Sequence, residues 1–222
     1  MATTAEVRRC TRLRGEPMRG RAAPERDSMS GTTNEGKEFM HYLSHYESPL
    51  GAMTMAGDGE HLTGLWFDGQ KYDRSTIDDD AVLQPRLPVF TQTAQWLDAY
   101  FEGADPGFTP PIRVEGSDFK KMVSSTMLSI PFGATSTYAR IAAEVARRMG
   151  RKQMSAQAVG GAVGRNPITL IVPCHRVLAS DGSLRGYAGG VDRKERLLEM
   201  EGVNMSGLST PPAADDGGGR RE

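Results

Sequence analysis

The residues best suited to chemistry in this chain are Cys174, His175 and Arg176, which follow Pro173 directly. A thiol attacks as its thiolate, and a neighbouring base or positive charge favours that form. Cys174 is next to both. Cysteine is also common as an inert core residue, so these residues alone fit equally well a buried structural cysteine beside a polar surface pair.

A short apolar run at residues 168–172 precedes the cysteine and predicts a buried strand. Pro173 would end that strand, because proline has no backbone N–H to donate to a sheet. We therefore expect Cys174 to be held rigidly at a strand end, where a nucleophile beside a base and a cation could act.

The composition is that of an ordinary globular protein, with 222 residues of which 38% are hydrophobic and 25% charged. This length allows one domain or two small ones. The sequence has no membrane-length apolar run, no signal-peptide segment, no phosphate-binding glycine loop and no internal repeat. Cys10 and Cys174 are too few for a disulfide framework, which favours a reducing compartment. The four histidines are scattered, so we expect no metal site.

Charge is distributed unevenly along the chain. Residues 38–117 carry 13 acidic and 4 basic side chains, whereas residues 118–200 carry 13 basic and 6 acidic ones. This asymmetry suggests two domains with different partners. A basic stretch around a candidate nucleophile indicates a polyanionic substrate. Two oppositely charged domains that only attract each other would give the same pattern.

The N-terminal half has the pattern of a small antiparallel sheet followed by a helix. Residues 1–37 are rich in Arg, Gly, Pro and Ser, and we expect them to be disordered. Residues 68–86 are polar and acidic, as in a connecting loop, and the apolar spacing of residues 89–101 predicts a helix. Strands separated by turns are predicted at residues 40–46, 52–56 and 61–67.

From Ser117 onward the pattern is helical. Ser117, Thr137 and Ser155 are predicted N-caps. The predicted helices cover residues 118–130, 138–149, 156–163 and 191–200. The second and third of these, joined by a tight turn, form a helix-turn-helix pattern. Residues 207–222 are expected to be a disordered tail.

The third helix of this half contains unusually many small residues, namely Ala156, Ala158, Gly160, Gly161, Ala162 and Gly164. Glycine weakens a helix by up to about 1 kcal/mol per residue. Such a helix is useful where a bulky object, such as a DNA groove, must approach the backbone closely. Tight packing in a protein core explains the composition equally well.

These stretches, in this order, resemble one family. Residues 120–202 closely resemble the O6-alkylguanine-DNA alkyltransferases, or methylated-DNA–protein-cysteine methyltransferases. Residues 41–71 resemble the family's variable N-terminal domain more weakly, and both tails lie outside the resemblance. The matching stretches are Ile130-Pro131-Phe132-Gly133, Thr137-Tyr138, Ala158-Val159-Gly160-Gly161-Ala162, Asn166-Pro167, Pro173-Cys174-His175-Arg176-Val177, Gly186-Tyr187-Ala188-Gly189-Gly190 and 194–201.

The resemblance implies an α+β fold with two domains. Residues 38–113 would form a small ribonuclease-H-like α/β domain with an antiparallel sheet. Residues 114–206 would form a mostly helical, DNA-binding helix-turn-helix domain that carries the active-site cysteine.

The resemblance also implies a DNA repair activity. The protein would bind double-stranded DNA containing O6-alkylguanine through the minor groove and flip the damaged base into a pocket. Cys174 would then take the alkyl group irreversibly, once per molecule and without a cofactor. O4-alkylthymine is a second candidate substrate. The family implies a monomeric, cytoplasmic protein of bacterial type. It would associate with the nucleoid when bound to DNA and would not associate with a membrane.

Residue roles come from the same resemblance. Cys174 would be the nucleophile, His175 would take its proton through a water molecule, and Glu201 would orient His175. Tyr138 would donate a hydrogen bond to N3 of the leaving guanine. Asn166 would tie the recognition helix to the cysteine turn.

The substrate would be held by Tyr187, which lines the base pocket, and by Val177, Ala188 and Gly189 around the base. The implied DNA-binding residues are Thr137, Ala156, Gln157, Gly160, Gly161 and Arg165. Two features depart from the family. An arginine often occupies the position of Gln157, and the N-terminal zinc ligands of some members are not evident.

Two other functions stay open at this point. A hydrolase could use Cys174, His175 and Glu201 as a triad, but it would turn over many times. A non-catalytic binder of alkylated DNA would share the fold, although known binders of that kind lack the cysteine.

Overall fold

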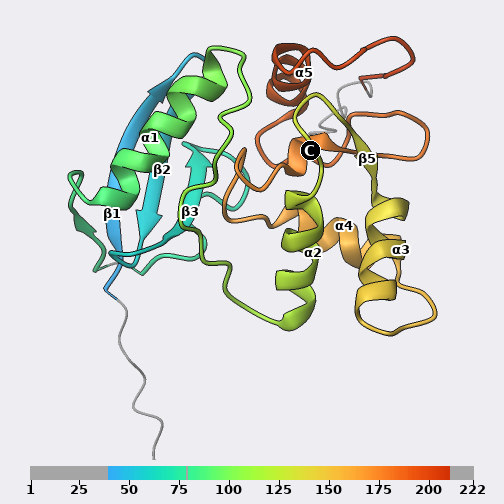
Figure 1. The fold of residues 1–222 in the computed structure, drawn as a ribbon, viewed down its shortest axis with the longest axis horizontal. Helices are drawn as coiled ribbons and strands as arrows, with labels where there is room; N and C mark the ends of the chain where they lie inside the picture. Colours follow the sequence, from blue (N-terminus) through green and yellow to red (C-terminus); the bar gives the residue numbers. More distant parts are fainter. Residues whose placement is uncertain (1–39, 79, 211–222) are drawn as a thin grey trace, which may run out of the picture. The chain divides into compact units, whose positions relative to one another are not determined.

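The computed structural model describes residues 40–78 and 80–210 (Figure 1). The expected N-terminal extension, residues 1–37, and most of the expected C-terminal tail lie outside this part of the chain. Of that tail, residues 207–210 are described. Ser209 forms a bridge with Ser183, and Leu208 packs against a small apolar cluster around Leu184 and Leu198.

The N-terminal half is a sheet with one helix across it. Strands β1 (Tyr42–Ser48), β2 (Gly51–Gly57) and β3 (Leu62–Phe67) pair antiparallel as consecutive hairpins. Helix α1 (Pro88–Phe101) lies against one face of this sheet (Figure 1). These elements confirm the predicted antiparallel sheet and its helix.

A fourth strand, β4 (Val82–Leu83), pairs in parallel with β1 and gives the order β3-β2-β1-β4. The prediction of a loop throughout residues 68–86 was therefore wrong at this point. Both residues of β4 are exposed, so they lack the alternation of buried and exposed positions from which a strand is recognised.

The C-terminal half is built from α2 (Asp118–Leu128), α3 (Tyr138–Arg148), α4 (Ala156–Gly164) and α5 (Val191–Met200). The predicted N-caps are confirmed: the side chains of Ser117, Thr137 and Ser155 each accept a hydrogen bond from a backbone N–H in the first turn of α2, α3 and α4. Helices α2, α3 and α4 pack on one another (Figure 1). The fold class is therefore α+β, as predicted.

Residues 168–172 do not form the predicted strand. They form a buried turn in which Leu170 has a left-handed φ of 67°. Only Ile168 pairs with a strand, at an isolated bridge to Leu65. A short apolar run shows that a segment is buried but does not distinguish a strand from a buried turn.

Strand β3 connects this turn to the N-terminal sheet. The Leu65 backbone donates to Pro167 O (2.8 Å) and accepts from the Thr169 N–H (2.9 Å). A second pair of backbone bonds joins Leu62 to Pro111 and Arg113. Side chains from both halves then form one apolar core. The segment that leads to Cys174 therefore depends on the N-terminal sheet for its position.

A two-stranded parallel sheet, which the sequence did not predict, lies beside the cysteine. Strand β5 (Ser136–Thr137) pairs with β6 (Val177–Leu178). β5 ends where α3 begins, and β6 follows Arg176 directly. This pairing places the start of α3, with Tyr138, beside the cysteine segment.

Leu65 offers a test of the shared core because its side chain is completely buried. We expect Leu65→Ala to lower the free energy of unfolding by about 2–5 kcal/mol. Leu83→Ala removes the same atoms from a side chain that is 59% exposed, and should cost less than about 0.5 kcal/mol. Urea unfolding measures both. Equal losses would contradict an apolar core that both halves share.

Candidate active site

Cys174 begins a short 3₁₀ helix, Cys174–Arg176, directly after Pro173. Its side chain is only 6% exposed, and its backbone N–H donates to Val172 O (2.8 Å). The cysteine therefore follows a buried turn, and the expectation of a strand end was wrong. The turn nevertheless holds the thiol in a fixed place, because surrounding side chains bind both the turn and the sulfur.

Asn166 is the main link between helix α4 and the cysteine. Its Nδ2 amide lies within hydrogen-bonding distance of Ile168 O (3.1 Å), Val172 O (2.7 Å) and Cys174 Sγ (3.1 Å). Its Oδ1 accepts from the Ile168 N–H (3.2 Å). One buried amide therefore shapes the turn and contacts the sulfur, as expected for the residue that ties α4 to the cysteine.

The sulfur is a thiol at rest. Burial raises the pKa of Cys174, and the hydrogen bonds of Asn166 and Thr169 with the charge of Lys194 oppose that rise only in part. A buried thiol with a raised pKa is a poor nucleophile until a base removes its proton. The site therefore needs a base close to Cys174.

His175 has the properties of that base. It is completely buried, and burial lowers its pKa despite the hydrogen bond and charge of Glu201, so the imidazole is neutral at neutral pH. Its Nε2 lies 2.7 Å from Glu201 Oε1 and donates to that carboxylate. Nδ1 has no protein partner in the described part of the chain. With Nε2 carrying the proton, Nδ1 is the nitrogen that can accept another.

The Glu201 carboxylate collects hydrogen bonds from four separate residues. Oε1 accepts from His175 Nε2, from the Tyr100 hydroxyl (2.7 Å) and from Arg176 Nη2 (3.0 Å). Oε2 accepts from Arg176 Nε (2.8 Å) and from the Gly133 N–H (3.2 Å). Burial alone would raise the pKa of Glu201, but the hydrogen bonds and charges of His175 and Arg176 lower it to about 2. The carboxylate therefore stays ionised.

Tyr100 is a site residue that the sequence did not identify, and Arg176, which the sequence offered as the cation beside the thiol, pairs with Glu201. Tyr100 is on α1, and its hydroxyl also lies 3.3 Å from His175 Nε2. The N-terminal half therefore contributes a side chain to the catalytic network. Arg176 forms a buried two-pronged ion pair with Glu201 and donates to Ile130 O (2.7 Å). Its position after His175 was a visible signal for Arg176. Tyr100 lies 101 residues from Glu201 in the sequence, and no local pattern links the two.

Lys194, on α5, is a further buried cation near the sulfur. Its Nζ donates to Val177 O (2.6 Å) and is completely shielded from solvent. Burial lowers the pKa of Lys194 to about 8, and a negative charge on Cys174 would oppose this shift. A cation here favours the thiolate. The Val177 carbonyl has a second lone pair with which it could still accept from a bound base.

Of the two predicted aromatic residues of the site, Tyr187 belongs to the glycine-rich loop 185–190 and Tyr138 contacts that loop from α3. Tyr138 is half-buried and donates toward the carbonyls of Arg185 (3.3 Å) and Gly186 (3.4 Å). A Cβ at Gly186 would lie 2.5 Å from the Tyr138 oxygen, so this close approach requires glycine. Burial, with the charge of Cys174, raises the pKa of Tyr138 to about 12. Tyr138 is therefore a protonated phenol that can donate.

Tyr187 is buried and its hydroxyl lies 3.0 Å from Thr169 Oγ1, in the cysteine turn. Its ring meets that of His175 edge-to-face, with 6.4 Å between ring centres. Ala188 and Gly189 follow it, and the Ala188 carbonyl accepts from the Lys71 N–H (3.2 Å). The structure thus brings Tyr187 into contact with both the cysteine turn and His175.

The predicted DNA-binding residues lie on α4, at its C-cap and at the start of α3. Ala156 and Gln157 are exposed in the first turn of α4, Gly161 is exposed one turn later, and Arg165 is exposed at its C-cap. A Cβ on Gly161 would meet no atom within 4 Å. Packing therefore does not require glycine there, and an open backbone surface favours the DNA explanation of these small residues over core packing.

Gly160 and Thr137 complete the predicted set, and both are close to Tyr138. A Cβ on Gly160 would be 3.8 Å from the Tyr138 ring, which is an ordinary contact. Thr137 caps α3 immediately before Tyr138. These two residues therefore connect the exposed face of α4 to the half-buried tyrosine.

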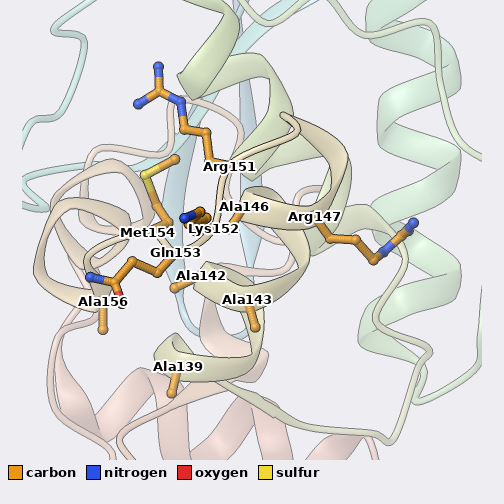
Figure 2. A pocket seen from close by; sticks show the side chains of 10 residues that line it. All are labelled: Ala139, Ala142, Ala143, Ala146, Arg147, Arg151, Lys152, Gln153, Met154 and Ala156. Atoms are coloured by element: carbon orange, nitrogen blue, oxygen red, sulfur yellow. The ribbon is translucent and has the colours of Figure 1, made fainter.

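A separate hollow of about 490 Å³ lies between α3 and the segment that leads to α4, and Figure 2 shows the side chains that line it. Four alanines of α3 form its floor, and Arg151 extends away from it in this view. None of its lining residues belongs to the network around Cys174. We therefore assign the chemistry to the cysteine turn rather than to this larger hollow.

Residues 40–78 and 80–210 contain no group of three or more His, Cys, Asp or Glu side chains arranged to hold a metal ion. The same residues include no helix that is long and apolar enough to cross a membrane.

Comparisons with known proteins find relatives of both halves of the chain. Residues 41–114 match the family model described as the ribonuclease-like domain of 6-O-methylguanine DNA methyltransferase, and residues 118–203 match the model of its DNA-binding domain. A methylated-DNA–protein-cysteine methyltransferase of Methanosarcina barkeri is 41% identical over 165 residues, which cover 74% of this chain and 99% of the relative.

The corresponding protein of Mycobacterium tuberculosis is 39% identical over 163 residues, covering 73% of this chain and 93% of that protein. The crystal structure of M. tuberculosis OGT in complex with DNA aligns with a TM-score of 0.63 at 38% identity, over 72% of this chain and 92% of that one. The chain therefore belongs to the methylated-DNA–protein-cysteine methyltransferase family.

Proposed function

We propose that this protein repairs O6-alkylguanine in double-stranded DNA by moving the alkyl group onto Cys174, once per molecule. The observation that carries the proposal is the arrangement of a buried thiol beside a neutral histidine whose other nitrogen is bound to an ionised carboxylate. Family membership supplies the class of substrate. The protein acts as a monomer in the cytoplasm, and O4-alkylthymine is a second candidate substrate.

In the transfer step, the Cys174 sulfur attacks the alkyl carbon on O6 of guanine. A new S–C bond forms, the C–O6 bond breaks, and its electron pair stays with the departing guanine. The thiol proton goes to His175 Nδ1 through a water molecule, and Glu201 stabilises the imidazolium that results. Tyr138 donates to N3 of guanine, which stabilises the negative charge that develops on the base. The thioether is stable, and this mechanism has no step that regenerates the thiol.

The DNA face is the exposed side of α4, where small residues let a groove approach the backbone. Gln157, in the first turn of this helix, lies at the position that could enter the space left by a flipped base. Thr137 and Arg165 flank this face from the start of α3 and the end of α4. Asn166 follows the C-cap of α4 and contacts the sulfur, so docking of this helix on DNA and placement of the flipped base at Cys174 are coupled.

The main alternatives differ in stoichiometry. A hydrolase built on Cys174, His175 and Glu201 would process many substrate molecules per protein, and a non-catalytic binder would process none. The proposed function requires one.

The central prediction concerns Cys174 itself. Incubation with duplex DNA carrying labelled O6-methylguanine should move the label to the peptide containing Cys174, with a limit of one methyl group per protein molecule. Peptide mapping locates the label. Cys174→Ala should accept none, because it lacks the nucleophile. Full transfer by that variant, or release of several labels per protein, would contradict the mechanism.

A second prediction compares how much His175, Glu201 and Tyr100 contribute to the rate of transfer. His175→Ala and Glu201→Gln should slow transfer by about 10²–10⁴-fold, the range of general base catalysis. Tyr100→Phe removes one donor but keeps the carboxylate ionised, so it should slow transfer by only about tenfold, equivalent to about 1.4 kcal/mol. Single-turnover rates on duplex DNA measure all three.

Binding and folding provide the controls for this series. None of these side chains is exposed to phosphate, so the affinity for DNA should change little. Glu201→Gln leaves the buried Arg176 without its counterion, so thermal unfolding must show that this variant is folded at the assay temperature. Equal losses of binding and rate would assign these residues a purely structural role.

A third prediction concerns Gln157. Arginine at this position would add a charge and a planar donor group near the phosphates. We therefore expect Gln157→Arg to tighten binding to lesion DNA and to make it more sensitive to salt. Gln157→Ala should slow repair of duplex DNA more than reaction with free O6-benzylguanine, which requires no base flipping. Equal slowing of both reactions would show that Gln157 supports the base pocket and does not fill the gap that the flipped base leaves in the duplex.

A further inference from the structure

We propose that Lys71, Tyr72 and Arg165 form a binding element for a backbone phosphate of the lesion-bearing strand, at the mouth of the base pocket. The inference rests on the proposed function and adds to it a contact from the N-terminal half, in a segment where sequence analysis predicted only a connecting loop.

The first observation is a cavity of about 330 Å³ that both halves of the chain line. The C-terminal half contributes glycines of α4 together with Arg165, and the glycine-rich loop contributes Tyr187 and Ala188. The N-terminal half contributes Lys71 and Tyr72. The cavity thus borders both the expected DNA face and the expected substrate pocket, and a flipped nucleotide that links the two must have its phosphate nearby.

The second observation is the charge around Tyr72. Lys71 Nζ lies 5.1 Å from the centre of the Tyr72 ring, and the Arg165 guanidinium lies 5.5 Å from the same centre. The ion pairs in the described part of the chain include neither cation. Two positive charges at one ring repel each other, and an anion between them would relieve that repulsion.

Arg74 provides the contrast within the same segment. Its guanidinium lies 3.6 Å from the Asp68 carboxylate and 3.8 Å from that of Asp73. The protein thus neutralises Arg74 internally, whereas Lys71 and Arg165 face the cavity with no carboxylate partner among residues 40–78 and 80–210. A phosphodiester is the singly charged anion that the proposed substrate carries at every nucleotide.

The third observation is the backbone conformation. Tyr72 and Arg74 have left-handed φ angles of 63° and 51°, which are unfavourable for residues with side chains. The surrounding structure enforces them: the Lys71 N–H donates to Ala188 O (3.2 Å), and Arg74 Nη2 donates to Thr54 Oγ1 (3.0 Å). Strain held in this way is typical of functional segments, and here it fixes Tyr72 beside Arg165 before DNA binds.

A phosphate contact at this place would favour lesions in DNA over free damaged bases, because a free base has no phosphate. The test therefore compares two substrates. Single-turnover rates are measured on duplex DNA with O6-methylguanine and on free O6-benzylguanine, and DNA affinity is measured at several salt concentrations. The variants are Lys71→Gln and Tyr72→Ala. Arg86→Gln, which removes an exposed charge from the same half outside the cavity, is the matched control.

Lys71→Gln should reduce the slope of log affinity against log salt by about one, the change for one lost phosphate contact. Its rate on O6-benzylguanine should stay within about twofold of wild type, since that reaction involves no phosphate. Tyr72→Ala should also weaken DNA binding, because it removes the ring beside which Lys71 and Arg165 lie. Arg86→Gln should leave the slope unchanged.

The inference is overturned if Lys71→Gln leaves the salt slope unchanged, if Arg86→Gln lowers it equally, or if the variants slow both substrates by the same factor. The last result would show that Lys71 and Tyr72 only line the base pocket. Failure of the wild-type protein to transfer label from duplex DNA to Cys174 would instead reject the proposed function, so the two failures are distinguishable.

Discussion

The rest of the site depends on the ion pair and hydrogen bonds of the Glu201 carboxylate. It is buried, yet it stays ionised because Arg176 pairs with it and because His175, Tyr100 and the Gly133 backbone donate to it. These donors come from α1, from the loop after α2 and from the cysteine segment. A buried charge is tolerated only when such partners are complete, so the carboxylate fixes several parts of the chain together.

This network resolves a chemical difficulty at the cysteine. A thiol that is deeply buried and held by Asn166 is well positioned, but burial raises its pKa and makes it unreactive. The same burial lowers the pKa of His175 and keeps its imidazole neutral, and Glu201 fixes which nitrogen carries the proton. The site therefore keeps an unreactive thiol next to a competent proton acceptor until an alkylated nucleobase enters.

The N-terminal half takes part in this arrangement. β3 binds the backbone of Pro167 and Thr169 at the start of the turn before Cys174, α1 supplies Tyr100, and the segment after β3 supplies Lys71 and Tyr72 to the cavity beside α4. A half that is acidic overall thus presents a local positive charge where the proposed DNA strand would pass. Net charge per region does not reveal such local exceptions, because it sums over faces that point in different directions.

Local chemistry in the sequence determined a large part of this protein. The N-caps Ser117, Thr137 and Ser155, the hairpins and the last helix follow from patterns within a few residues, and the ordered motifs around Cys174 were sufficient to indicate the family. Tertiary structure alone decided the rest. The apolar run before the cysteine became a turn because the Asn166 amide and β3 bind its backbone, and β4 and β5 exist only through their pairing partners. Tyr100 reaches Glu201, and Tyr72 reaches Arg165, across long stretches of sequence. No local pattern encodes such contacts, because they depend on how separate elements pack.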